Sequence, residues 1–103
     1  MGFYIYILRC ADGSFYVGHT RNLEHRVWRH QSGQFGGYTA TRLPVELVFC
    51  EEMMSVKEAF EREVQIKRWS RAKKLALIAR DWALLSRLAR NRSDQGRGST
   101  GSP

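Results

Sequence analysis

The chain has 103 residues, a length that suits one domain with a single modest hydrophobic core and excludes two. Hydrophobic residues make up 43% of it and aromatic residues 12%, which argues against a disordered chain. The formal net charge of +7 predicts a polyanionic partner, either nucleic acid or an anionic membrane. No apolar run approaches the length that a membrane-spanning helix needs.

A β-hairpin is predicted near the N-terminus, where residues 3–9 and 15–20 are rich in aromatic and β-branched side chains. The length of its turn decides where two tyrosines point. A two-residue turn would send Tyr6 and Tyr16 to opposite faces of the sheet. A three-residue turn that ends at Gly13, in the left-handed conformation of a G1 bulge, puts both on one face. We predict the three-residue turn.

A helix follows the hairpin. Asn22 can cap its N-terminus, and the helix is expected to end near Ser32, with a glycine just beyond. Arg26 and His30 are four residues apart, so they lie on one helical face. The polar residues 34–43 then predict a loop.

A third strand is predicted over residues 45–51, and a longer helix after it. Ser55 and Glu58 form a capping box, which predicts a helix that runs to about residue 69. Its apolar arc comprises Val56, Ala59, Phe60, Val64 and Ile66. Such an arc is typical of the face that a helix buries.

Glu63 lies near the centre of this arc, where an acid is unexpected. An ionised carboxylate there loses much of its hydration free energy unless it is paired or binds a metal. Lys67, one helical turn later, offers a structural ion pair. A metal site requires that other polar groups converge on the same point. The spacing alone leaves both alternatives open.

Two further helices are predicted, one capped by Ser70 and one that begins at or continues through Asp81. Residues 91–103 are rich in Gly, Ser and Arg without an apolar anchor, and we predict a disordered tail. The predicted fold class is therefore α+β, a small three-stranded antiparallel sheet flanked by helices in one domain, residues 1–90.

The cysteines predict reduced core residues rather than a metal site. Cys10 and Cys50 both fall in or next to predicted strands, and no signal peptide precedes them, so we expect a cytoplasmic protein. Together with three histidines they could nominally bind zinc, but their spacing matches no zinc motif.

The second half of the chain is strongly basic. Only Asp81 opposes nine cations between residues 64 and 92: Lys67, Arg68, Arg71, Lys73, Lys74, Arg80, Arg87, Arg90 and Arg92. A solvated helical surface is one interpretation. The imbalance of sign favours the other, a surface that faces phosphates.

Several of these motifs, in this order, resemble the GIY-YIG nuclease domain. The matching residues are Tyr4-Ile5-Tyr6, Tyr16-Val17-Gly18, Arg26, His30 and Glu63. The chain is most similar to the compact bacterial UPF0213 branch, which is also similar to the nuclease domain of the Slx1 endonucleases. The resemblance is strongest over residues 2–78.

The resemblance implies an endonuclease that uses one Mg²⁺ or Mn²⁺ ion, held by Glu63 and bound weakly without substrate. It implies that Tyr6 or Tyr16, assisted by His30, helps to deprotonate the attacking water, and that Arg26 binds the scissile phosphate. Arg26 and the metal would also lower the pKa of a phenol, which is ordinarily near 10. We expect DNA rather than RNA as substrate, a role in repair or processing, and a monomer.

Other residues are expected to contact nucleic acid: Tyr4, Gly18, His19, Arg42, Lys67, Arg68, Arg71, Lys73 and Lys74. Three departures from the family pattern stand out. Tyr4 replaces the first glycine of the motif, His19 is an unusual polar choice after Gly18, and the asparagine that many members carry after the metal helix has no counterpart. The alternative function is a non-catalytic, basic nucleic-acid-binding module on the same fold.

Overall fold

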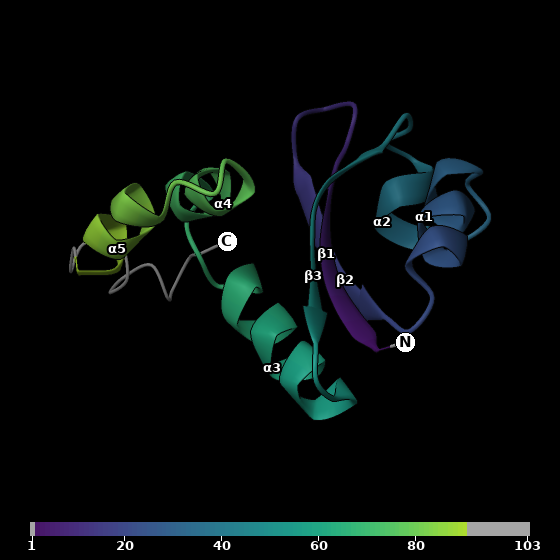
Figure 1. Ribbon diagram of the computed structural model, residues 1–103. Coiled ribbons are helices and arrows are strands. Elements are labelled where there is room, and N and C mark those ends of the chain that lie inside the picture. Colours follow the sequence, from purple (N-terminus) through teal and green to yellow (C-terminus); the bar gives the residue numbers. More distant parts are fainter. Residues whose placement is uncertain (1, 91–103) are drawn as a thin grey trace. The chain divides into compact units, whose positions relative to one another are not determined.

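The computed structural model describes residues 2–90 of the chain, so the predicted tail 91–103 lies outside the described residues. Its elements are β1 (Phe3–Arg9), β2 (Phe15–Thr20), α1 (Leu23–Gln31), α2 (Gly37–Ala40), β3 (Glu46–Met53), α3 (Val56–Lys67), α4 (Arg71–Ile78) and α5 (Trp82–Arg90). The three strands form one antiparallel sheet in the order β2-β1-β3 (Figure 1). The predicted α+β class with a three-stranded antiparallel sheet is confirmed.

The contacts within the chain divide it into two compact units, and the boundary falls inside α3. One unit ends at Glu63 and holds the sheet, α1, α2 and the first part of α3. The other begins at Val64 and holds the rest of α3 with α4 and α5, which pack on each other. Every residue of the candidate site described below belongs to the first unit.

The hairpin has the predicted three-residue turn. The backbone N–H of Cys10 donates to the carbonyl of Ser14 over 2.8 Å, and the N–H of Gly13 donates to the carbonyl of Cys10 over 2.9 Å. Gly13 has φ +86°, the left-handed conformation that the G1 bulge requires. β1 and β2 therefore pair with Tyr6 opposite Gly18.

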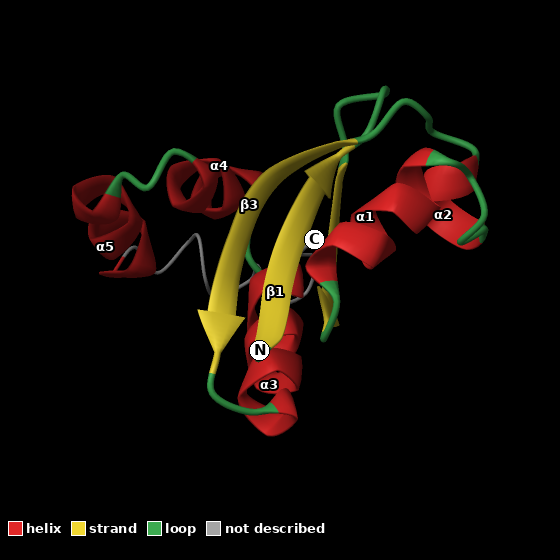
Figure 2. Ribbon diagram, turned by 45° about the vertical axis from the view of Figure 1, so that its right-hand side comes forward, coloured by secondary structure: helices red, strands yellow, loops and turns green. Residues whose placement is uncertain are grey.

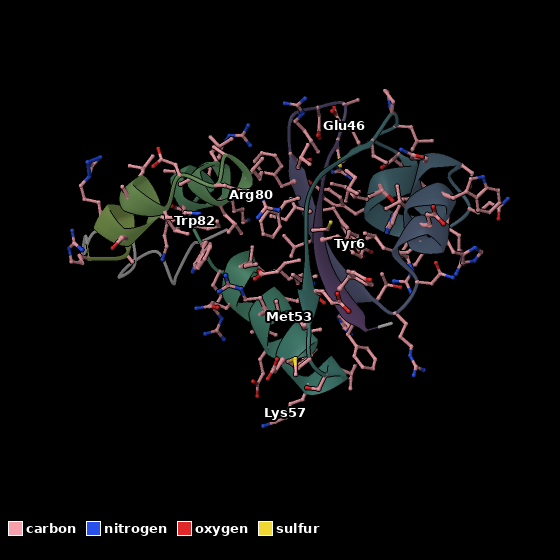
Figure 3. The ribbon with its side chains drawn as sticks, in the orientation of Figure 1. Tyr6, Glu46, Met53, Lys57, Arg80 and Trp82 are labelled. Carbon is pink, nitrogen blue, oxygen red and sulfur yellow. The ribbon has the colours of Figure 1, made fainter. Side chains whose placement is uncertain are left out.

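This register places the two motif tyrosines on one face of the sheet. Tyr16 pairs with Leu8, so its side chain shares the face of Leu8 and Tyr6, whereas Ile5 and Ile7 point to the other face. Helices α1 and α2 lie on the tyrosine face (Figures 1 and 2). Figure 3 shows Tyr6 on this side, between the sheet and the two helices.

The helix caps predicted from the sequence are present. The Asn22 side chain accepts the N–H of His25 over 3.1 Å. In the capping box, the Ser55 hydroxyl accepts the N–H of Glu58 over 3.2 Å, but the Glu58 carboxylate reaches the N–H of Met54 rather than that of Ser55. The Glu58 carboxylate therefore reaches one residue further back along the chain than it does in a standard capping box.

Ser70 caps α4, as predicted, by accepting the N–H of Lys73 over 3.2 Å. Asp81, which was predicted to begin or continue the last helix, stands at its start and accepts the N–H of Leu84 over 3.1 Å. The prediction of a loop over residues 34–43 was wrong in part, because α2 forms inside it. A four-residue helix that follows a glycine with φ +77° is too short to show a periodic apolar pattern.

The predicted apolar arc of α3 is only partly buried. Ala59 and Ile66 are fully buried, but Val56 and Phe60 are 51% and 55% exposed. The predicted apolar arc is therefore wider than the part of the helix surface that packing covers.

Cys10 is buried and Cys50 half-buried, and both are free thiols, in agreement with the prediction. Along residues 2–90, none of the helices has the length and apolar character that crossing a membrane would require.

Candidate active site

A buried chain of hydrogen bonds lies between the sheet and the two helices on its tyrosine face. The Tyr6 hydroxyl lies 3.0 Å from Nε2 of His30, and Nδ1 of His30 lies 2.7 Å from the Thr39 hydroxyl. Tyr6 and His30 are completely buried and Thr39 is 1% exposed. β1, α1 and α2 thus each contribute one member of the chain.

His30 is a neutral imidazole in this environment. Its pKa is lowered to about 4, chiefly by burial and also by the positive charges of Arg26 and Arg29. A neutral imidazole carries one proton, so one ring nitrogen donates while the other accepts. The chain can therefore run from Tyr6 through His30 to Thr39 or in reverse, an arrangement that can pass a proton.

Burial also changes the acidity of Tyr6. It raises the pKa of this phenol to about 12, although the neighbouring Arg26 guanidinium acts in the opposite direction. The expectation that Arg26 makes a motif phenol more acidic therefore fails for Tyr6, since desolvation outweighs the cation. At neutral pH Tyr6 therefore keeps its hydroxyl proton.

Tyr16 occupies the more open position of the two tyrosines. Its ring centroid lies 4.9 Å from that of His30, 6.4 Å from that of Tyr6 and 6.2 Å from that of Tyr38, on which it stacks at 28°. Tyr16 is half-buried, whereas Tyr6 is fully buried. Of the two phenols, Tyr16 is the one that solvent can reach.

Gly18 makes room for Tyr6 rather than for a ligand. A Cβ atom at this position would lie 2.6 Å from the Tyr6 hydroxyl and 2.8 Å from the ring carbon that bears it. Gly18 is itself buried. The tyrosine ring thus crosses over the edge strand β2 at the one residue that has no side chain.

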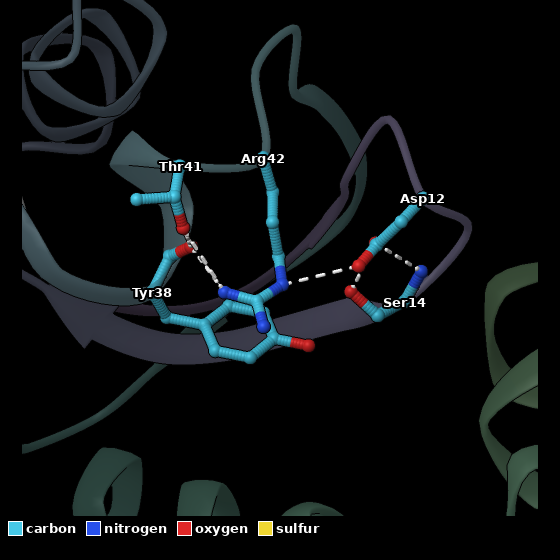
Figure 4. A network of polar contacts seen from close by, with 5 residues as sticks. All are labelled: Asp12, Ser14, Tyr38, Thr41 and Arg42. Atoms are coloured by element: carbon cyan, nitrogen blue, oxygen red, sulfur yellow. Dashed lines mark hydrogen bonds and ion pairs between the residues drawn. The ribbon is translucent and has the colours of Figure 1, made fainter.

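A polar network braces the far end of the site (Figure 4). Nε of Arg42 donates to Asp12 over 3.1 Å, and its Nη1 donates to the Tyr38 carbonyl over 3.0 Å and to the Thr41 hydroxyl over 3.2 Å. The guanidinium also lies 3.7 Å from the centroid of the Tyr38 ring. Hydrogen bonds from Ser14, assisted by Arg42, lower the pKa of Asp12.

The network links the hairpin turn to the ring that supports Tyr16. Asp12 holds Arg42, Arg42 covers Tyr38, and Tyr38 stacks on Tyr16. The structure therefore gives Arg42 a bracing role, and its predicted contact with nucleic acid stays a prediction.

Glu63 meets the sheet at His19. Its carboxylate is hydrogen-bonded to Nδ1 of the His19 imidazole, and its side chain is only 13% exposed. His19 pairs with Ile5 in the sheet, so it points to the face opposite Tyr6. Glu63 still acts electrostatically on Tyr6 and contributes to its raised pKa, since only the bare strand at Gly18 separates the two sides. The acid is therefore shielded, as its place on the apolar arc predicts.

A hollow of about 600 Å³ opens beside these groups. It is lined by Phe3, His19, Thr20, Arg21, Asn22, Arg26 and Val56. Its volume suits a small ligand or one nucleotide. Two arginines in its wall supply the positive charge that a phosphate needs.

The remaining predicted contacts fall in different places. Tyr4 is half-buried and lines another groove of about 610 Å³ beside α1. Lys67, Arg68 and Arg71 are exposed, as phosphate contacts should be. Lys73 is instead buried, with its ammonium 4.6 Å from the centroid of the Trp69 ring. Lys73 therefore packs inward, and its predicted contact with nucleic acid stays a prediction.

Burial and a nearby cation, Arg71, lower the pKa of Lys74, which is half-buried.

Two members of the site, Tyr38 and Thr39, were absent from the sequence predictions. Their signal is a tyrosine-threonine pair directly after two glycines, which by itself predicts only a polar loop.

The low pKa of His30 predicts that the protein loses stability in mild acid. The unfolded imidazole binds a proton near pH 6.5, whereas the folded one resists it down to about pH 4. The contribution of His30 to the free energy of unfolding is therefore fully present above pH 6.5. It falls by about 3 kcal/mol as the pH is lowered towards 4. The free energy of unfolding, measured with urea between pH 4 and 6.5, should rise with pH, and His30→Gln should remove this pH dependence. His25→Gln, at an exposed histidine of α1, should keep it, and an unchanged slope in His30→Gln would contradict the assignment.

Comparison with known families gives a match over most of the chain. The model of the GIY-YIG catalytic domain matches residues 2–76. A UPF0213 protein of Staphylococcus saprophyticus is 47% identical over 76 residues, which cover 74% of this chain and 93% of that protein. A UPF0213 protein of Natronomonas pharaonis is 49% identical over 76 residues, which cover 74% of this chain and 89% of that protein.

Solved structures agree. The solution NMR structure of a UPF0213 protein from Bacillus halodurans is 40% identical, with a TM-score of 0.51 over 77% of this chain and 84% of that chain. A solution NMR structure of a protein from E. faecalis is 34% identical, with a TM-score of 0.55 over 82% of this chain and 88% of that chain.

Proposed function

The chain belongs to the GIY-YIG catalytic domain family, within its UPF0213 group, and we propose that it is an endonuclease that hydrolyses phosphodiester bonds in nucleic acid with one divalent cation. DNA is the proposed substrate rather than RNA, in a repair or processing reaction. The observation that carries the proposal is the convergence of Tyr6, Tyr16, Arg26 and His30 on one face of the sheet, beside a hollow lined by arginines.

The two tyrosines have different roles in this proposal. Tyr6 is fully buried and bonded to His30, so it orients the imidazole and holds a proton within the chain that ends at Thr39. Tyr16 is the phenol that can meet the attacking water, since it is half-buried and its ring lies against His30. Because a neutral phenol cannot take up a proton, the hydroxyl proton of Tyr16 would first pass to solvent at the open edge of the site, and the phenolate would then take a proton from the attacking water.

Arg26 is proposed to hold the scissile phosphate. It lines the hollow and interacts with the Tyr6 hydroxyl, so a phosphate bound by its guanidinium would lie near the motif phenols. The guanidinium can bond two phosphate oxygens at once and stabilise the charge that develops on them.

Glu63 fits the proposed cation. Its carboxylate is shielded, and an anion in such a place gains from a cation that replaces its lost hydration. Among residues 2–90, no three His, Cys, Asp or Glu side chains gather as a complete metal cage. Mg²⁺ and Mn²⁺ suit such an incomplete site, because Mg²⁺ usually keeps several waters and takes further ligands from substrate phosphate. When bound, the ion supplies Lewis-acid stabilisation of the phosphate oxygens.

The proposal is tested with a cleavage panel. Branched, single-stranded and duplex DNA and RNA are incubated with the protein in Mg²⁺ or Mn²⁺, next to a variant that lacks the Glu63 carboxylate. Metal-dependent cleavage that the variant loses supports the proposal. Salt-sensitive binding without any cleavage would leave the non-catalytic binding module as the function.

The division of labour between the tyrosines gives a prediction of its own. Tyr16→Phe should lower the cleavage rate about a hundredfold while the free energy of unfolding changes little, because the group lost is a proton acceptor at the open edge of the site. Tyr6→Phe should instead lower the free energy of unfolding by about 1–3 kcal/mol, because it leaves the buried Nε2 of His30 without its partner. Single-turnover cleavage and urea unfolding of both variants measure the two effects. If Tyr16→Phe lowered mainly the free energy of unfolding and Tyr6→Phe mainly the cleavage rate, the roles proposed for the two tyrosines would be exchanged.

A further inference from the structure

We propose that His19 is a second protein ligand of the cation, so that the site binds metal through one imidazole nitrogen and one carboxylate oxygen and prefers Mn²⁺ to Mg²⁺. This inference rests on the proposed function only in taking Glu63 as the metal residue. It adds a ligand from a different element, the edge strand β2, and with it a metal preference.

The geometry that carries the inference is the pairing of His19 with Glu63. Nδ1 of the imidazole and an oxygen of the carboxylate face each other in a hydrogen bond. The two side chains are 30% and 13% exposed, so the pair is largely shielded from water but not sealed from it. The hydrogen bond already brings one nitrogen ligand and one oxygen ligand together, and a cation would take the place of the proton between them.

The imidazole is held in this orientation by packing as well. The Phe60 ring, one helical turn before Glu63, meets the His19 ring at 6.1 Å between centroids and 78° between planes. This contact gives a reason for a residue that is otherwise exposed on the apolar arc. A fixed ring loses little further freedom when it binds a cation.

The position also suits the proposed reaction. His19 and Arg26 both line the hollow of about 600 Å³, so a phosphate held there by the arginine would also lie near the proposed cation. The neighbouring Gly18 keeps the strand bare between the cation and Tyr6. A metal bound by His19 and Glu63 therefore reaches the substrate at the edge of β2.

The nitrogen ligand decides which metal is favoured. Mg²⁺ binds oxygen ligands and dehydrates reluctantly, whereas imidazole suits softer transition metals, and affinity for mixed nitrogen and oxygen sites rises from Mn²⁺ onward in the series. A cation held by His19 would use the lone pair of Nδ1, so the ring would carry its proton at Nε2.

The test measures metal binding without nucleic acid. Mn²⁺ is titrated by electron paramagnetic resonance into the full chain, His19→Gln and His25→Gln, and pulsed spectra of the bound ion are searched for coupling to an imidazole nitrogen. We expect the coupling in the full chain and in His25→Gln, and its loss in His19→Gln with Mn²⁺ affinity about tenfold lower. Mg²⁺ affinity, measured by competition, should change less than about twofold, because Mg²⁺ gains little from the nitrogen.

A bound Mn²⁺ without nitrogen coupling, or equal Mn²⁺ affinity in the full chain and His19→Gln, overturns the inference and leaves His19 as a hydrogen-bond partner that orients Glu63. The inference and the proposed function can fail separately. Nitrogen-coupled Mn²⁺ in a protein that cuts nothing keeps the metal site and removes the nuclease. If His19→Gln still cleaves nucleic acid and its preference for Mn²⁺ is unchanged, the nuclease is kept and His19 is removed as a metal ligand.

Discussion

Glu63→Gln is expected to lower the rate of nucleic acid cleavage at least about a thousandfold. The amide has the shape of the carboxylate but not its charge, so it cannot hold a divalent cation, whose stabilisation of the transition state is worth several kcal/mol. The fold should be kept, or should become more stable, because the variant removes a shielded charge. Glu63→Ala should abolish cleavage in the same way.

The matched control is Glu61→Gln on the same helix. Glu61 is an exposed acid in an ion pair with Lys57, 3.5 Å away on the helix surface, and its loss should leave cleavage unchanged. Single-turnover rates with Mg²⁺ and with Mn²⁺, together with urea unfolding of each variant, separate catalysis from folding. Cleavage by Glu63→Gln within about tenfold of the original rate would remove Glu63 from the metal site and with it the proposed mechanism.

Gly18→Ala is expected to disrupt the site from within the sheet. The added methyl group would stand 2.6 Å from the Tyr6 hydroxyl, and that tyrosine has nowhere to move, since it is fully buried and bonded to His30. Overpacking of this kind costs about 1–3 kcal/mol of folding free energy. Displacement of the phenol also breaks its bond to the imidazole, so we expect cleavage to fall at least about tenfold in the folded fraction.

Gly2→Ala provides the comparison for this prediction. There the new methyl group would meet only the side chain of Glu52, whose far end can swing away, so stability and cleavage should both be kept. Urea unfolding gives the stability of both variants, and the imidazole proton resonances of His30 report on its bond to Tyr6. A Gly18→Ala protein with unchanged stability and unchanged His30 resonances would show that the Tyr6 ring does not cross the strand here.

The surroundings of Glu63, the proposed metal residue, could be predicted in part. An acid at the centre of an apolar arc predicts a partner for Glu63, and the structure supplies one. The sequence offered Lys67 or a metal, and neither spacing nor composition pointed to His19, because the two residues are 44 positions apart. Contacts of that range depend on how α3 lies against β2, which no local pattern encodes.

The burial of single residues was harder still to predict. Phe60 belongs to the apolar arc and would be assigned to the core, yet it is 55% exposed beside His19. Thr39 belongs to a polar stretch and would be assigned to solvent, yet it is buried as the partner of His30. Periodicity shows which face of a helix could be buried, and packing decides how much of it is.

Local chemistry was sufficient for the elements and for the face of the tyrosines. Strand composition, the caps at Asn22, Ser70 and Asp81, and the turn that ends at Gly13 act over a few residues, so the sequence alone determined the hairpin register and the common face of Tyr6 and Tyr16. Only the tertiary structure decided how these phenols differ. Desolvation by the whole fold raises the pKa of Tyr6 to about 12 and lowers that of His30 to about 4, and this burial comes from segments that are distant in the chain.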